Sequence, residues 1–195
     1  MKRLFLLMVL AISVFMFTGC SERKTLDSAR SSLNSAFECD MKMNYDNSEF
    51  DARLKRIEPG VWETEFTAPD TLAGVKLMFS GNDVTASYKG LSFTVPKKAL
   101  PVKSILTNFI TTVDTLAAAP ELQGSEKDGV MTVTGETESG TYTLTMDTKS
   151  GLLNSFSMKN IPVQINFENM QVLSTQPAET TPVTMLNEPV QITES

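Results

Sequence analysis

The side chains that could carry out chemistry in this 195-residue chain are mostly carboxylates and hydroxyls, because it has two cysteines and no histidine. Without imidazole, Ser-His-Asp and Cys-His catalysis and most zinc sites are excluded. Glu63 and Glu65 could form a carboxylate pair, but both fall on the polar side of an alternating segment. Asn82 and Asp83 lack the spaced acidic ligands of a calcium loop. We therefore expect no enzymatic activity, no metal and no cofactor.

Cys20 is the residue whose surroundings indicate a modification. It follows a short basic start, an almost unbroken apolar run over residues 4–17 and two small residues. The run has the length of a secretory h-region and is shorter than the ~20 residues that span a membrane. Phe17-Thr18-Gly19-Cys20 resembles the lipobox of bacterial lipoproteins, with Phe17 in place of the usual Leu. The resemblance implies that the signal peptide, 1–19, is removed and that Cys20 is diacylated on sulfur. The alternative is an ordinary secretory signal followed by a chance cysteine.

The charge balance limits the partners of the exported chain. The formal net charge is −6, and removal of 1–19 leaves 15 basic against 23 acidic residues. An acidic chain argues against nucleic acid and offers no basic patch for anionic lipids. With Cys20 acylated, Cys39 is the only thiol, so no intrachain disulfide is expected; its place on an apolar strand face predicts a buried, inert thiol.

The first part of the chain predicts a short helix and a series of strands. Residues 26–36, after a polar tether (20–25), carry one narrow apolar stripe, which predicts an amphipathic helix capped by Thr25. From Phe37 apolar and polar residues alternate, as in half-buried strands. Turn residues such as Asp46-Asn47-Ser48 separate these segments. Six strands are predicted here: 37–45, 50–55, 62–66, 74–80, 84–88 and 91–95.

A second amphipathic helix interrupts the strands. Eight apolar residues between 102 and 117 recur with the helical period, and Pro120 follows. Such a stripe needs a large apolar partner. Residues 174–195 then form a Thr- and Pro-rich tail. Between the helix and the tail the pattern predicts four strands: 129–136, 141–148, 152–159 and 163–173, the last with a bulge at Glu168-Asn169.

Ten strands with one apolar face each must bury that face, either as a two-sheet sandwich or by curling around something. A single antiparallel sheet curled around the two helices uses every apolar face, so we expect one mainly β (α+β) domain over residues 26–173. The order of these elements behind a signal sequence resembles the LolA/LolB superfamily of bacterial envelope carriers and acceptors. Local features also match the superfamily pattern: Lys55, Arg56, Pro59-Gly60, Trp62, Pro69-Asp70, Gly81-Asn82 and Tyr88.

The resemblance implies an incomplete β-barrel of about 10–11 strands whose concave apolar face, covered by the helices, binds acyl chains. It also implies a lid contact for Arg56, although the superfamily arginine stands directly before the proline, where this chain has Glu58. Methionine-rich strands suit a lining that accepts variable tails. Core packing is the alternative role for each lining residue. Strand parity predicts this lining: Met41, Met43, Leu54, Trp62, Phe66, Leu77, Phe79, Ile105, Phe109 and Val113.

We therefore expect a lipoprotein, anchored to the extracytoplasmic face of a membrane through Cys20, that binds a lipid or acylated ligand without covalent chemistry. An outer-membrane location is open if the cell has one. The alternative is an envelope sensor or regulatory module of the same fold that binds a protein partner and carries no lipid. Lys97-Lys98, before the second helix, could meet phosphate headgroups, although two loop lysines are usually just solvated.

Overall fold

The computed structural model describes residues 30–99 and 104–173. The predicted signal peptide, Cys20, the tether, the cap at Thr25 and the tail at 174–195 lie outside the described residues, so these remain predictions. Of the first predicted helix, residues 30–34 are described and are helical. Within the described ranges, no helix has the length and apolarity needed to cross a membrane.

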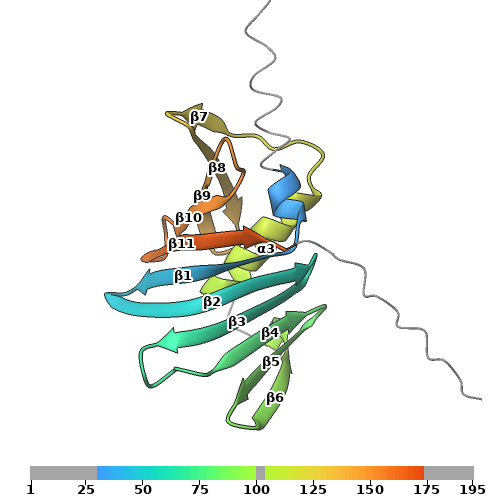
Figure 1. Ribbon diagram of the computed structural model, residues 1–195, viewed down its shortest axis with the longest axis vertical. Helices are drawn as coiled ribbons and strands as arrows, with labels where there is room; N and C mark the ends of the chain where they lie inside the picture. Colours follow the sequence, from blue (N-terminus) through green and yellow to red (C-terminus); the bar gives the residue numbers. More distant parts are fainter. Residues whose placement is uncertain (1–29, 100–103, 174–195) are drawn as a thin grey trace, which may run out of the picture.

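The strands form one open antiparallel sheet, curled around the helices (Figure 1). Its spatial order is β6-β5-β4-β3-β2-β1-β11-β10-β9-β8-β7. The predicted architecture, a curled and incompletely closed antiparallel sheet with two helices, is confirmed. The eleven strands are β1 (Phe37–Tyr45), β2 (Ser48–Glu58), β3 (Val61–Ala68), β4 (Lys76–Ser80), β5 (Asp83–Tyr88), β6 (Leu91–Pro96), β7 (Ser125–Lys127), β8 (Val130–Thr137), β9 (Gly140–Asp147), β10 (Leu153–Met158) and β11 (Val163–Val172).

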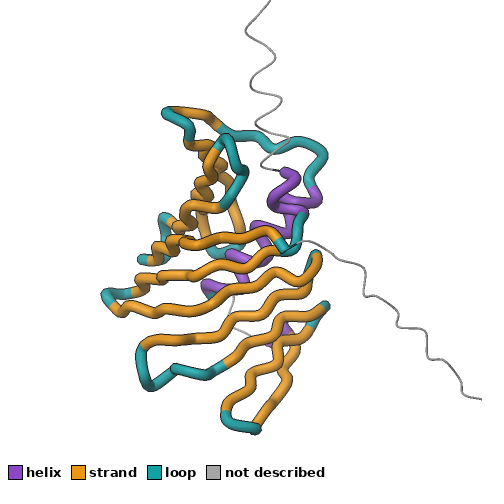
Figure 2. Tube along the Cα trace, in the orientation of Figure 1, coloured by secondary structure: helices purple, strands orange, loops and turns teal. Residues whose placement is uncertain are grey.

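The topology explains the place of the long helix. The first and last strands pair with each other in the middle of the sheet, so β6 and β7 become its two outer edges. The short 3-10 helix η2 (Lys97–Ala99) and the helix α3 (Ile105–Ala118) connect these edges. The connection therefore runs along the inner face, and the helices lie on one side of the sheet (Figure 2).

Local chemistry sets the ends of the strands. Asp46 and Asn47 have φ angles of 49° and 61° and form the two-residue turn between β1 and β2. Asn and Asp tolerate this left-handed region, which tight hairpins require. Asn169, with φ of 52°, lies where the pairing of β1 with β11 shifts its register. The bulge predicted at this position is confirmed.

The structure differs from the sequence expectations at a few boundaries. Ser125–Lys127 forms the edge strand β7, which the sequence pattern did not predict because all three residues are polar and exposed. The strand predicted to start at residue 74 begins at Lys76, because residues 69–75 form a hydrogen-bonded turn. Of the helix predicted over 102–117, residues 102 and 103 lie outside the described ranges.

Candidate functional site

Helix α3 fills the centre of the concave side of the sheet. Its apolar stripe is buried there, with Phe109 fully covered. The Phe109 ring lies 5.7 Å from the ring of Trp62, 5.4 Å from Phe156 and 5.0 Å from Phe167, measured between centroids. Aromatic pairs at these separations stabilise a core beyond their area burial. One helical side chain therefore connects β3, β10 and β11.

A charged contact joins the same helix to strand β2. Arg56 has an exposed fraction of 0%, and its Nε and Nη2 donate to Asp114 Oδ1 over 3.2 and 3.0 Å. Its Nη1 donates to the carbonyl oxygen of Ser35 over 3.1 Å. Trp62 Nε1 donates to Asp114 Oδ2 over 3.0 Å. Both carboxylate oxygens of Asp114 are thus occupied, and the buried guanidinium has the partners that burial demands.

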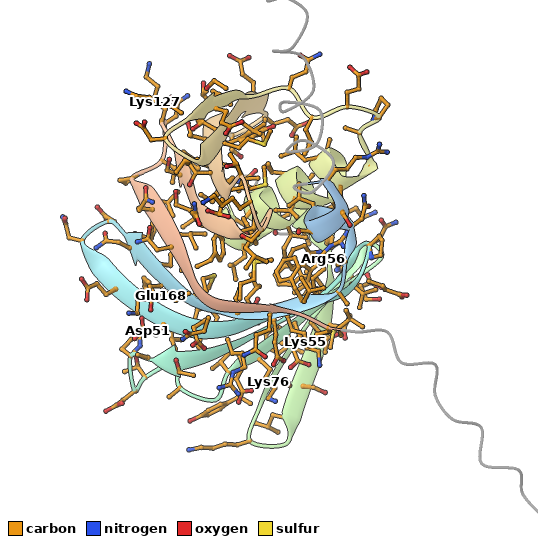
Figure 3. All side chains as sticks on the ribbon, turned by 45° about the horizontal axis from the view of Figure 1, so that its top comes forward. Asp51, Lys55, Arg56, Lys76, Lys127 and Glu168 are labelled. Carbon is orange, nitrogen blue, oxygen red and sulfur yellow. The ribbon has the colours of Figure 1, made fainter. Side chains whose placement is uncertain are left out.

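Figure 3 shows Arg56 on the inner side of the sheet, beside the helices. The lid contact predicted for Arg56 thus has a counterpart in its contact with α3, but its role in opening or closing a cavity stays a prediction. Sequence reasoning missed Asp114. The signal was present, because Asp114 is the one charged residue in the fourteen-residue sequence of α3.

The residues predicted to line a cavity come together in the core. Eight of the ten are buried, whereas Leu77 and Ile105 are partly buried and pack against the same cluster. None of them lines the polar pocket described below, and Met43 borders a smaller pocket with Lys42 and Asp51. They therefore form a packed interior around α3 here, and their contact with a ligand stays a prediction.

The apolar inner face continues beyond the part that the helix covers. Val84 of β5 is buried and pairs with Val95 of β6. Two residues further along β6 on the same face lies Phe93, which is 66% exposed, and two further lies Leu91, which is 77% exposed. Tyr88, paired with Leu91, is also exposed. We call Tyr88, Leu91 and Phe93 the edge patch. Large apolar side chains exposed together indicate a binding surface.

A polar pocket of about 460 Å³ lies beside α3. Thr107, Thr111 and Thr115 line it at four-residue spacing, so they occupy one face of the helix. The β8–β9 hairpin provides the opposite wall, and η2 contributes two lysines. Thr112 of the same helix is 3% exposed and also lines this pocket. The remaining lining residues are Lys97, Lys98, Asn108, Glu136, Thr137, Glu138, Ser139 and Tyr142.

Cys39 lies in the kind of environment that the sequence predicted for it. Cys39 is free and buried. Burial, followed by the nearby charges of Asp40 and Glu38, raises the pKa of its thiol to about 12. Its neutral form therefore persists at physiological pH, and the predicted inert thiol agrees with this environment. Among the described residues, no cluster of Cys, Asp and Glu has the arrangement of a metal site.

Comparison with known proteins identifies relatives by fold. No protein-family model and no curated protein matches this chain. An uncharacterized conserved protein from Thermus thermophilus is similar with a TM-score of 0.52 and 11% identity, over 80% of this chain and 90% of that chain. At this identity the likeness concerns the fold.

The matches also include a member of the superfamily that the sequence resembles. A LolA superfamily protein from Nitrosomonas europaea aligns with a TM-score of 0.42 and 11% identity, over 81% of this chain and 96% of that one. A chain of the Pseudomonas aeruginosa MucA/MucB complex aligns with a TM-score of 0.44 and 14% identity, over 78% and 57% of the two chains. A function must therefore be argued from the residues of this chain.

Proposed function

We propose that this protein is an extracytoplasmic envelope lipoprotein, held at a membrane through acylated Cys20, that binds a lipid or acylated ligand without covalent chemistry. The observation that carries the proposal is the edge patch, where the apolar inner face of the sheet continues past the helix. Leu91 and Phe93 are 77% and 66% exposed there. Single exposed apolar residues are common in soluble proteins, but two on one strand face beside an exposed tyrosine form a surface.

An acyl chain laid on this patch would remove its own methylene groups and the two side chains from water. Each buried CH₂ contributes about 0.8 kcal/mol, so a chain of several methylenes can bind there by area burial alone. Deeper entry would require α3 to move, since Phe109 and its neighbours occupy the interior. That movement would also separate Arg56 from Asp114.

The second candidate function is a sensor or regulatory module that binds a protein partner. The filled interior favours it, because Trp62, Phe109 and Phe156 are completely covered and already pack edge to face. In this case the edge patch, on β5 and the outermost strand β6, would be covered by the partner. Edge strands offer unpaired backbone groups as well as side chains, and a peptide can pair with them.

Native mass spectrometry with extraction of bound material tests the two functions. The chain starting at Ser21 contains every described element and can be purified without detergent. Co-purified acyl species, or uptake of a fluorescent fatty acid by the apo protein, would support the lipid-binding function. A clean apo mass together with refusal of added fatty acid would overturn it and leave the protein-binding function.

A further inference from the structure

The pocket beside α3 brings together charges of both signs. It is lined by Lys97 and Lys98 of η2 and by Glu136 and Glu138 of the β8–β9 hairpin. Among the described residues, none of the four takes part in an ion pair. Two cationic groups on one element and two anionic groups on another, around a space of about 460 Å³, suit a ligand that carries both charges.

A buried hydroxyl in the same pocket has no partner in the part of the chain that the structure describes. Thr112 is 3% exposed, lines the pocket, and its Oγ1 forms no hydrogen bond there. Leaving a buried hydroxyl without a partner is unfavourable, so native proteins rarely do so unless a further group completes it. Next to it, the hydroxyl-bearing residues Thr107, Thr111 and Thr115 form a row along the helix.

We propose that this pocket binds a phosphate ester that carries an ammonium group, of the phosphoethanolamine type. The two lysines contact the phosphate oxygens, and the two glutamates contact the ammonium group. Threonine hydroxyls between them, including that of Thr112, bind the ester oxygens. Charge-assisted contacts of this kind are about twice as strong as neutral ones. Two adjacent lysines favour a phosphate over a single carboxylate because a phosphate presents more acceptor oxygens.

The position of the lysines connects the pocket to the edge patch. Lys97 directly follows the last residue of β6, and Phe93 and Leu91 lie four and six residues before it. At ~3.3 Å per residue these side chains lie roughly 13 and 20 Å along the strand from Lys97. An acyl chain spans half of a membrane's hydrocarbon core, which is about 15 Å, so its length is similar to these distances. A lipid with its headgroup in the pocket could therefore lay an acyl chain along β6. This second half of the inference rests on the proposed function.

Calorimetric titration of the full-length protein with water-soluble compounds tests the pocket. The probes are glycerophosphoethanolamine, which has both charges, and glycerol phosphate and ethanolamine, which have one each. We expect the first to bind at least about tenfold more tightly than either of the others. No measurable binding at millimolar concentration, or equal affinity for glycerol phosphate, would overturn the inference.

Paired substitutions separate the two charges. Lys97→Gln with Lys98→Gln should weaken glycerophosphoethanolamine and glycerol phosphate about tenfold or more. Glu136→Gln with Glu138→Gln should weaken only the first. The matched control is Glu126→Gln with Lys127→Gln, on the exposed edge strand β7, and should change neither affinity. Unchanged binding in the lysine variant would contradict the assignment.

A short-chain phosphatidylethanolamine, used below its micelle concentration, distinguishes a lipid from a free headgroup compound. Tighter binding than glycerophosphoethanolamine, with the gain lost in Phe93→Ser, identifies a lipid. Equal binding identifies the free compound: the pocket assignment then stands and the acyl-chain path falls. Conversely, a protein that takes up fatty acid at the edge patch but ignores every headgroup probe would keep the proposed function and lose this inference.

Discussion

Arg56 on strand β2 and Asp114 on helix α3 are 58 residues apart in the chain and form a hydrogen-bonded ion pair, with Nη2 3.0 Å from Oδ1. The guanidinium is completely buried, whereas the carboxylate side chain is 22% exposed. The pair also engages Trp62 and the carbonyl of Ser35. It therefore ties the long helix, the N-terminal helical segment and two strands together at one point.

Replacement of Asp114 by Asn should lower the free energy of unfolding by about 3 kcal/mol. The variant leaves the buried Arg56 charge without a counter-ion, and removal of one partner of a buried pair costs about 3–5 kcal/mol. The partial exposure of Asp114 places the estimate at the low end. Urea unfolding monitored by the fluorescence of Trp62, the only tryptophan, measures it.

Two further variants check that this loss comes from the buried charge. Adding Arg56→Met to Asp114→Asn should cost less than the sum of the two single changes, because the orphaned charge is gone. Glu65→Gln breaks the exposed ion pair with Lys76 and should leave the free energy of unfolding nearly unchanged, because water screens the pair. A loss at Asp114 as small as that at Glu65 would show that the pair does not hold the helix.

Phe109 and Phe93 provide a matched test of which phenylalanines form the core. Phe109→Ala should destabilise the fold by about 3–5 kcal/mol, because it opens a cavity between Trp62 and Phe167. Phe93→Ala should cost less than about 1 kcal/mol, since its side chain is mostly in water. Thermal or urea unfolding of both variants measures the difference. Similar losses would mean that Phe93 is covered in solution.

Local pattern was sufficient for most of the fold. The change of period at Phe37 and the stripe through Phe109 placed the strands and the helix, because alternation and 3.6-residue spacing each leave a signature in neighbouring residues. The three polar residues of β7 carry no such signature. That strand forms because β8 offers a pairing edge, which is information held elsewhere in the chain.

The site was less accessible to sequence reasoning because it depends on distant pairs. Arg56 was selected through a family resemblance, but nothing near it in the sequence indicates Asp114. The predicted lining followed from strand parity, which tells on which face of the sheet a side chain lies but not what covers that face. Parity alone cannot show that Phe79 is buried while Phe93 stays in water. The charges of the polar pocket likewise come from elements that meet only in the folded chain.

The thiol of Cys39 predicts a pH dependence of stability. Its pKa rises from 9.0 in the unfolded chain to about 12 in the fold. The contribution of the neutral Cys39 thiol to the free energy of unfolding is fully present below pH 9. It is lost between pH 9 and about 12, because in that range the unfolded thiol ionises while the folded one stays protonated. The limiting slope is about 1.4 kcal/mol per pH unit. Unfolding titrations should show a steeper decline for wild type than for Cys39→Ala. An equal decline of stability with pH in both proteins would contradict a buried Cys39 thiol with a raised pKa.

The edge patch predicts where an acyl chain binds. Leu91→Ser with Phe93→Ser should weaken the binding of a fluorescent fatty acid by more than about tenfold, because each side chain contributes up to about 1.5–3 kcal/mol when it is fully covered. Both residues are exposed in the apo protein, so stability should hardly change. Ile57→Ser is the matched control: Ile57 is 41% exposed but lies on β2, which is separated from the edge strand β6 by β3, β4 and β5. It should leave the affinity unchanged. Equal weakening in the control and in the double variant would show that the fatty acid binds to apolar surface in general. In that case the patch would be better explained as a protein interface.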